Sequence, residues 1–113
     1  MGVVERTAIR RGDVVLVELD PTRGSEIRKT RPCLVVSPDE LNEHLSTYIV
    51  IPLTTGGHAY PFRLNCRFEG KAGHIVADQI RTIDDDRIVR RLGKLSDSVV
   101  RRTLEVLQRM FSA

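Results

Sequence analysis

The chain has 113 residues, enough for one domain but too few for two of ordinary size, so we expect a single domain over residues 1–113. Apolar residues make up 41% and charged residues 29%, a balance that excludes an intrinsically disordered chain. The net charge of +3 favours a nucleic acid as partner, whereas 4% aromatic residues and no Trp argue against base stacking on exposed rings.

The N-terminal segment and the cysteines indicate the cellular compartment. Residues 1–13 carry a charge every few positions and lack the apolar core of a signal peptide, and no apolar run is long enough to span a membrane. Cys33 and Cys66 form no CxxC pair and have no metal-finger spacing to a histidine. We therefore expect a cytoplasmic protein with reduced cysteines and no membrane association.

The first half of the chain predicts two strands, a loop and a short helix. Residues 13–19 are apolar and β-branched almost without interruption, which predicts a strand with both faces largely covered. Residues 20–31 predict a basic loop, in which Pro, Gly, Thr and Ser cluster. A strand over 33–37 follows, and Ser37 is the expected N-cap of a helix over 38–45.

The second half predicts short strands separated by turns. The expected strands cover residues 47–53, 61–65, 74–80 and 91–95. Turns are expected over 54–58 and 67–73, and one helical turn over 84–89. Ser96 is the expected N-cap of a terminal helix that runs to about Phe111, with apolar residues at helical spacing. Together these elements predict a mainly β (α+β) fold, a small and partly open barrel with short inserted helices and a C-terminal helix.

Arg31 and the two threonines at 54 and 55 are the first candidates for phosphate binding. Arg31 ends the basic loop, and a guanidinium can hold two phosphate oxygens at once. The hydroxyls of Thr54 and Thr55 follow a predicted strand and can donate to a phosphate oxygen. The structural alternative is that Arg31 packs on Pro32 or pairs with Glu26, and that the threonines only cap a turn.

Asp78, Gln79 and Arg81 add polar groups at the end of a predicted strand. Burying such groups unpaired would be costly, so they either bind neighbouring backbone or line a pocket. The three histidines of the chain show no pair four residues apart on a helix, so the sequence predicts no metal site. Solvation or packing is the expected role of each histidine.

Seven short blocks follow one another along the chain. They are RGDVVLVELDPTRGSE at 11–26, RP at 31–32, SP at 37–38, IPLTT at 51–55, YPF at 60–62, DQIRT at 78–82 and RLG at 91–93. Each block alone is weakly specific, but in this order they resemble the MazF/PemK (Kid) family of toxin endoribonucleases. On this resemblance the chain is identified as a member of that family, which belongs to type II toxin–antitoxin systems.

The resemblance implies a small, SH3-like, curved β-barrel of PemK/CcdB type that forms a homodimer, with RNA lying across a groove at the dimer face. It implies sequence-specific cleavage of single-stranded RNA, messenger RNA in particular, that inhibits translation and growth without a metal or other cofactor. The 2′-hydroxyl would attack the adjacent phosphorus, leaving a cyclic phosphate and a free 5′-hydroxyl, so DNA would not be cut. A MazE-like antitoxin with a flexible acidic tail is the implied partner.

The resemblance also implies roles for single residues. Arg31 matches the catalytic arginine that stabilises the phosphorane, and Thr54 matches the catalytic threonine that holds the scissile phosphate. Glu26 is the candidate general base, although Ser25 stands where some members carry a histidine that acts instead. The residues expected to bind substrate are Ser25, Arg28, Thr55, Asp78, Gln79 and Arg81.

Asp78 has a second interpretation, because it matches an acid that is assigned to catalysis in one branch of the family. That branch carries an arginine where this chain has Val76, so the proton-transfer roles stay open between Glu26 and Asp78. Three rival functions remain: a CcdB-like gyrase inhibitor on the same fold, an RNA-binding barrel without catalysis, and a metal-dependent nuclease that uses both acids. The presence of Arg31 together with Thr54 favours the metal-free nuclease.

Overall fold

The computed structural model describes residues 8–19, 29–56 and 60–113. Within these residues, seven strands, two α-helices and two 3-10 turns follow in an order that confirms the expected mainly β class. The elements are β1 (Asp13–Glu18), β2 (Thr30–Val35), α1 (Asp39–Asn42), β3 (Thr47–Thr55), β4 (Arg63–Phe68), β5 (Lys71–Val76), η1 (Ala77–Gln79), β6 (Arg81–Asp84), η2 (Asp85–Arg87), β7 (Ile88–Lys94) and α2 (Asp97–Met110).

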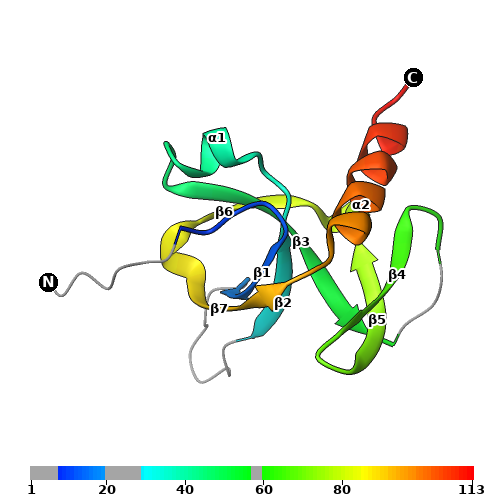
Figure 1. Cartoon of the computed structure of the whole chain (residues 1–113), viewed down its shortest axis with the longest axis horizontal. Helices are drawn as coiled ribbons and strands as arrows, with labels where there is room; N and C mark the ends of the chain where they lie inside the picture. The colour runs from blue at the N-terminus through cyan, green and yellow to red at the C-terminus, as the bar shows by residue number, and fades with distance from the viewer. Residues whose placement is uncertain (1–7, 20–28, 57–59) are drawn as a thin grey trace, which may run out of the picture.

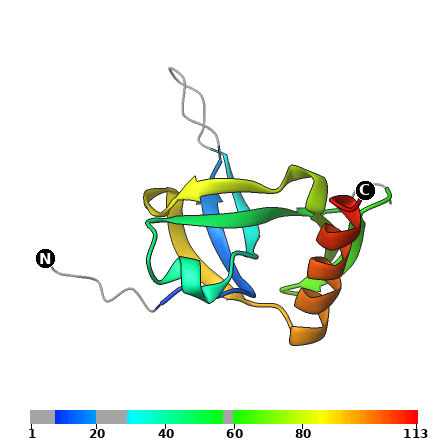
Figure 2. The same ribbon diagram turned by 90° about the horizontal axis from the view of Figure 1, so that it is seen from above.

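The strands form one antiparallel sheet in the order β4-β5-β3-β2-β1-β7. Strand β3 is the centre of the sheet, because β2 pairs with one edge while β6 and β5 share the other edge. The sheet is curved and, within the described residues, not closed, since β4 and β7 stand at its two ends. Figures 1 and 2 show α2 beside the β4–β5 hairpin at one end of the molecule and α1 at the other.

Both faces of the central strands are buried, as the uninterrupted apolar sequence of β1 predicted. Val14 packs with Leu34 in a cluster that also takes in the apolar face of α2, whereas Val15 packs with Cys33 in a second cluster on the opposite face. All four side chains are fully buried. Because residues alternate between two covered faces, the ends of these strands are where polar side chains can reach solvent.

The C-terminal helix begins as expected. The Ser96 hydroxyl accepts a hydrogen bond from the Val99 backbone N–H at 3.4 Å, which satisfies one of the free donors of the first turn. Val100 and Thr103 are the buried residues of the helix, and the Thr103 hydroxyl donates to the carbonyl of Val99 at 2.8 Å. The expected cap and terminal helix are therefore confirmed.

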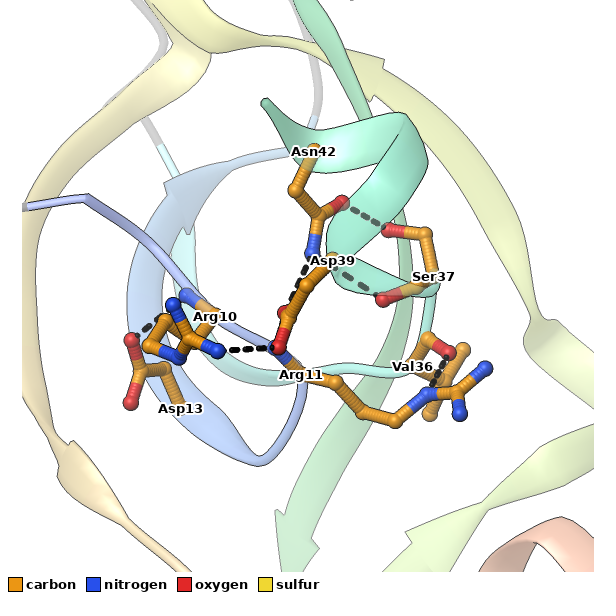
Figure 3. Close-up of polar contacts among 7 residues, drawn as sticks. All are labelled: Arg10, Arg11, Asp13, Val36, Ser37, Asp39 and Asn42. Carbon is orange, nitrogen blue, oxygen red and sulfur yellow. Dashed lines mark hydrogen bonds and ion pairs between the residues drawn. The ribbon is translucent and has the colours of Figure 1, made fainter. Parts of the chain in front are cut away.

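The expected cap of α1 is wrong. Pro38 occupies the N-cap position, and the Ser37 hydroxyl instead donates to Oδ1 of Asn42 at 2.6 Å and accepts from the backbone N–H of Ile49. Figure 3 shows Ser37 and Asn42 bound to each other within a larger polar network. Ser37 is almost fully buried, so its hydroxyl joins α1 to the start of β3 rather than capping a helix.

Asp39 ties the start of β1 to α1 in the same network (Figure 3). Its carboxylate accepts from the Arg10 guanidinium at 2.8 Å and from the Arg11 backbone N–H at 2.7 Å. The Arg11 side chain in turn donates to the carbonyl of Val36 at 2.8 Å. This network lies at the end of the molecule away from α2 and fixes the segment that enters the sheet.

The prediction of a turn over residues 67–73 is wrong. Strand β4 continues to Phe68 and β5 begins at Lys71, so Glu69 and Gly70 alone form the turn of a hairpin. Both turn residues have positive φ, 52° and 77°, which is the geometry of a type I′ hairpin turn. Because Glu is uncommon at positive φ, only Gly70 signalled a turn in the sequence, and the exact turn could not be predicted.

Further expectations about strands need correction. Thr54 and Thr55, expected in a turn, are the last residues of β3, because β5 extends the sheet beside them. Of the rest of that expected turn, Gly56 is described and residues 57–58 lie outside the described residues. The strand expected over residues 74–80 ends at Val76, because Ala77–Gln79 form the 3-10 turn η1. Strand β6, for which no element was expected before Asp84, pairs in register with the first half of β3.

Candidate active site

The pairing of β2 with β3 leads toward Arg31 and Thr54. In this pair Leu34 lies opposite Ile51 and Cys33 opposite Pro52, where the pairing ends. Arg31 comes two residues before Cys33, near the start of β2, and Thr54 two residues after Pro52, near the end of β3. The two residues that the sequence selected separately for phosphate binding therefore lie just beyond this pairing, at the ends of their strands.

Both residues line an open groove with a volume of about 650 Å³. Its apolar residues include Leu16, Pro32, Leu53 and Phe68, while Thr54 and Thr55 supply hydroxyl groups. The charged residues that line it are four cations and one carboxylate: Lys29, Arg31, Lys71, Arg90 and Glu69. An excess of positive charge around a groove open to solvent is suited to an extended chain of phosphates.

Arg81 supplies a second positive charge near Cys33, as Arg31 does. Burial of the Cys33 thiol raises its pKa to about 12, and the positive charges of Arg81 and Arg31 oppose that rise. Both guanidinium groups therefore lie near this thiol. Arg81 lies opposite Val50 on β6 and is exposed, so it extends the positive surface beyond the groove without lining it.

Asp78 and Gln79 lie outside the groove. Both are exposed residues of η1 and do not line the groove. Both carboxylate oxygens of Asp78 accept from the Arg63 guanidinium at 2.9 Å, and this hydrogen bonding lowers the pKa of Asp78. Arg63 also lies over the ring of Tyr60, with 4.8 Å between the guanidinium carbon and the ring centroid. The structure thus brings Asp78 to Arg63 and not to Arg31.

Ser25, Glu26 and Arg28 lie outside the described residues. Of the other predicted site residues, the groove gathers Arg31, Thr54 and Thr55, and it leaves Asp78, Gln79 and Arg81 at other positions. In the described part of the chain, no cluster of three or more His, Cys, Asp or Glu side chains is placed to hold a metal ion. None of the helices described here is both long and apolar enough to cross a membrane.

Sequence reasoning missed two residues of β5 that lie against the end of β3. Gly73 is opposite Thr55, and a Cβ at Gly73 would overlap the carbonyl oxygen of Thr54. His74 is opposite Thr54, and its Nδ1 lies 2.7 Å from the carbonyl oxygen of Gly56. A glycine inside a strand is a known sign of close backbone approach, so Gly73 was the signal that the sequence offered.

The fold is an open, curved antiparallel sheet, and an arginine and two threonines line its cationic groove. These features define a small protein suited to binding the phosphates of a nucleic acid strand. Residues 10–111 match the family described as PemK-like, MazF-like toxin of type II toxin–antitoxin system. The chain belongs to this family, as its short sequence blocks predicted.

Individual relatives agree with this assignment. Endoribonuclease toxin ChpB of Escherichia coli (strain K12) is 34% identical over an alignment of 113 positions, which covers 94% of this chain and 97% of that protein. Endoribonuclease toxin MazF of the same strain is 35% identical over 81 residues, 72% of this chain and 73% of that protein. The crystal structure of MazE–MazF from Deinococcus radiodurans superposes with a TM-score of 0.75 at 28% identity, over 93% of this chain and 99% of that chain.

Proposed function

We propose that the groove beside Arg31 and Thr54 is where this toxin endoribonuclease of a type II toxin–antitoxin system cuts single-stranded RNA. The observation that supports the proposal is that Arg31, with its guanidinium, and Thr54, with its hydroxyl, line one open groove together with three further cations. A strand of RNA bound there would have one phosphate between these two groups. We expect the cut to be sequence-specific and to fall on messenger RNA, which would stop translation and growth.

The reaction we propose is an internal transesterification. The 2′-oxygen attacks the adjacent phosphorus, the bond from phosphorus to the 5′-oxygen breaks, and a cyclic phosphate and a 5′-hydroxyl remain. The 2′-proton passes to a base, and the leaving 5′-oxygen takes up a proton. The 2′-oxygen is itself the nucleophile, so the proposed reaction needs no water, metal or cofactor. The crowded phosphorane carries more negative charge than the bound RNA, and donors placed for that charge lower the barrier.

Arg31 and Thr54 are suited to stabilising the phosphorane. Arg31 is exposed on the groove, so its planar guanidinium is free to bind two phosphate oxygens at once. Thr54 is half-buried, and its hydroxyl is a donor on a rigid strand rather than on a loop. Thr55 on the rim and Arg81 beside Cys33 are proposed to hold the flanking phosphates.

The proposed general base is Glu26, with Ser25 and Arg28 as further contacts from the same segment. Asp78 is the less suitable base, since the Arg63 hydrogen bonds lower its pKa and hold its carboxylate outside the groove. We therefore assign Asp78 and Gln79 to RNA contacts beyond the scissile phosphate.

The proposal extends to partners. The structure of MazE–MazF from Deinococcus radiodurans is that of a toxin with its antitoxin. We propose that a MazE-like antitoxin holds this toxin inactive by laying an acidic segment in the cationic groove, where it excludes RNA. We also propose that the toxin acts in the cytoplasm, where its RNA is, and as a homodimer.

The test uses the purified protein, its Arg31→Ala and Thr54→Val variants, and a mixed-sequence single-stranded RNA in EDTA. The native protein should leave cyclic phosphate and 5′-hydroxyl ends at a recurrent sequence, and DNA of the same sequence should stay intact. Removing the guanidinium should slow cleavage by about 10²–10³-fold, as loss of one oxyanion donor does. Intact RNA at high enzyme concentration would contradict the proposal and turn attention to gyrase inhibition or to RNA binding alone.

A further inference from the structure

Strand β5 contacts both the backbone N–H and the carbonyl oxygen of Gly56, the residue that follows the end of β3. The Gly56 backbone N–H donates to the carbonyl of Ala72 at 3.3 Å, and the Gly56 carbonyl oxygen lies 2.7 Å from Nδ1 of His74. Gly56 follows directly after Thr54 and Thr55 and has a φ of +68°, in the region that glycine adopts without steric cost. The two contacts with β5 therefore restrict a residue whose backbone can adopt many conformations.

The contact shows that Nδ1 of the His74 imidazole carries a proton. A backbone carbonyl can only accept a hydrogen bond, so Nδ1 of His74 must carry the proton that is shared with Gly56. The ring is therefore either the neutral tautomer with its proton on Nδ1 or the imidazolium ion, and both forms donate. The hydrogen bond to Gly56 is consequently available in both forms.

His74 is also aligned with the proposed catalytic threonine. In the β3–β5 register His74 lies directly opposite Thr54, so the two side chains emerge on the same face of the sheet. Its imidazole reaches past Thr55 to the carbonyl two residues beyond Thr54. Gly73 permits this arrangement, because its missing side chain allows β5 to lie against the Thr54 carbonyl.

We propose that His74 is a positioning residue, which holds the Gly56 carbonyl and thereby fixes the Thr54 hydroxyl at the place of the scissile phosphate. The inference rests on the proposed cleavage of RNA in this groove. The hydrogen bond ties the short segment from Thr54 to Gly56 to β5 and thereby restricts the position of the Thr54 hydroxyl. Displacement of a reacting or binding group by about 1 Å can reduce a rate by about 10²-fold, so such a clamp affects the chemical step more than RNA binding.

The chain offers a matched control. His44 makes the same kind of contact, with Nδ1 2.7 Å from the carbonyl oxygen of Glu40. Neither imidazole lines the groove, but His44 lies beside α1, whereas His74 is on the strand that pairs with Thr54. The test compares His74→Leu, His74→Asn and His44→Leu with the native protein on one RNA of defined sequence. The Asn side chain carries its amide nitrogen on Cγ, as His carries Nδ1, so His74→Asn keeps a donor for Gly56.

We expect His74→Leu to lower kcat by about ten- to a hundredfold while KM changes less than about threefold. His74→Asn should recover most of the lost rate, and His44→Leu should cleave like the native protein. As a second readout, exchange of the Gly56 amide hydrogen should be faster in His74→Leu than in the native protein and His74→Asn, without RNA present. Thermal unfolding of each variant identifies any general loss of the fold.

The possible results separate the two proposals. If the native protein cuts RNA and His74→Leu cuts it equally fast, the positioning role is overturned and the cleavage proposal stands. The same conclusion follows if His74→Leu and His74→Asn are slowed equally, or if the change appears in KM alone. If the native protein cuts no RNA at all, the proposed function itself fails, and with it the role of His74 in catalysis.

Discussion

At the scale of single residues, Gly73 is a position in the groove where a side chain would not fit. A Cβ there would lie 2.8 Å from the carbonyl carbon of Thr54 and overlap its oxygen, so one of two paired backbones would have to move. Overpacking of this kind costs about 1–3 kcal/mol. We expect Gly73→Ala to lower the free energy of unfolding by that amount, measured as a lower midpoint of urea unfolding with an unchanged slope.

Gly70 in the same hairpin is the control for Gly73. It has a φ of +77°, and a Cβ there would meet no atom within 4 Å. Asn adopts positive φ more readily than other residues with a side chain, so we expect Gly70→Asn to cost less than about 1 kcal/mol. A Gly73→Ala protein as stable as Gly70→Asn would show that β5 does not approach Thr54 as closely as described.

The same scale shows why the site was only partly predictable. Arg31 and Thr54 could be selected from the sequence because their groups suit phosphate and because they fit the blocks of a known family. His74 could not, because its role depends on the β3–β5 register, which brings it opposite Thr54 from a distant part of the chain. The pairing of Asp78 with Arg63 could not be predicted from the sequence either, because packing decides which partner each of these polar residues has.

At the scale of elements, the sequence predicted helix α2 and strand β1 well and the β4–β5 hairpin poorly. Both successes rest on local signals: a serine before a helical pattern, and an uninterrupted apolar strand. The hairpin was missed because half-exposed strands carry mixed residues such as those of β4, whose burial alternates. Their pairing is decided by neighbours in the sheet, which local propensity does not contain.

Two serines allow a comparison of a local hydrogen bond, the cap of a helix, with hydrogen bonds that join distant parts of the chain. Ser96 caps α2 through one long hydrogen bond of 3.4 Å, while buried Ser37 joins Asn42 to Ile49 through two. We expect Ser96→Ala to cost about 0.5–1 kcal/mol, because solvent can replace the cap. Ser37→Ala should cost more, about 1–3 kcal/mol, because it leaves buried polar groups without partners.

Unfolding of both variants in urea under the same conditions provides the comparison. The two changes remove the same hydroxyl, so the side-chain chemistry is matched and the surroundings differ. Equal losses, or a larger loss for Ser96→Ala, would mean that the network around α1 contributes little to stability.

At the scale of the whole molecule, the distribution of charge matters more than its sum. The net charge is only +3, yet the groove combines four cations with a single carboxylate. Two of the three lysines, Lys29 and Lys71, line the groove, whereas Lys94 at the end of β7 does not. Composition alone suggested a mildly basic protein, and the fold places four of its cations around one groove.

Lys71 therefore provides a test of the groove as the RNA-binding surface. Each phosphate neutralised by a cation in a complex with single-stranded nucleic acid adds about 0.7 to the slope of log K against log salt concentration. Binding of a 2′-O-methyl RNA, which lacks the attacking hydroxyl and stays uncut, can be measured by fluorescence anisotropy over a range of salt. We expect Lys71→Ala to weaken binding and reduce the slope by about 0.7, while Lys94→Ala changes neither. If both substitutions change the slope equally, the RNA follows the general charge of the protein, and the groove is not its binding site.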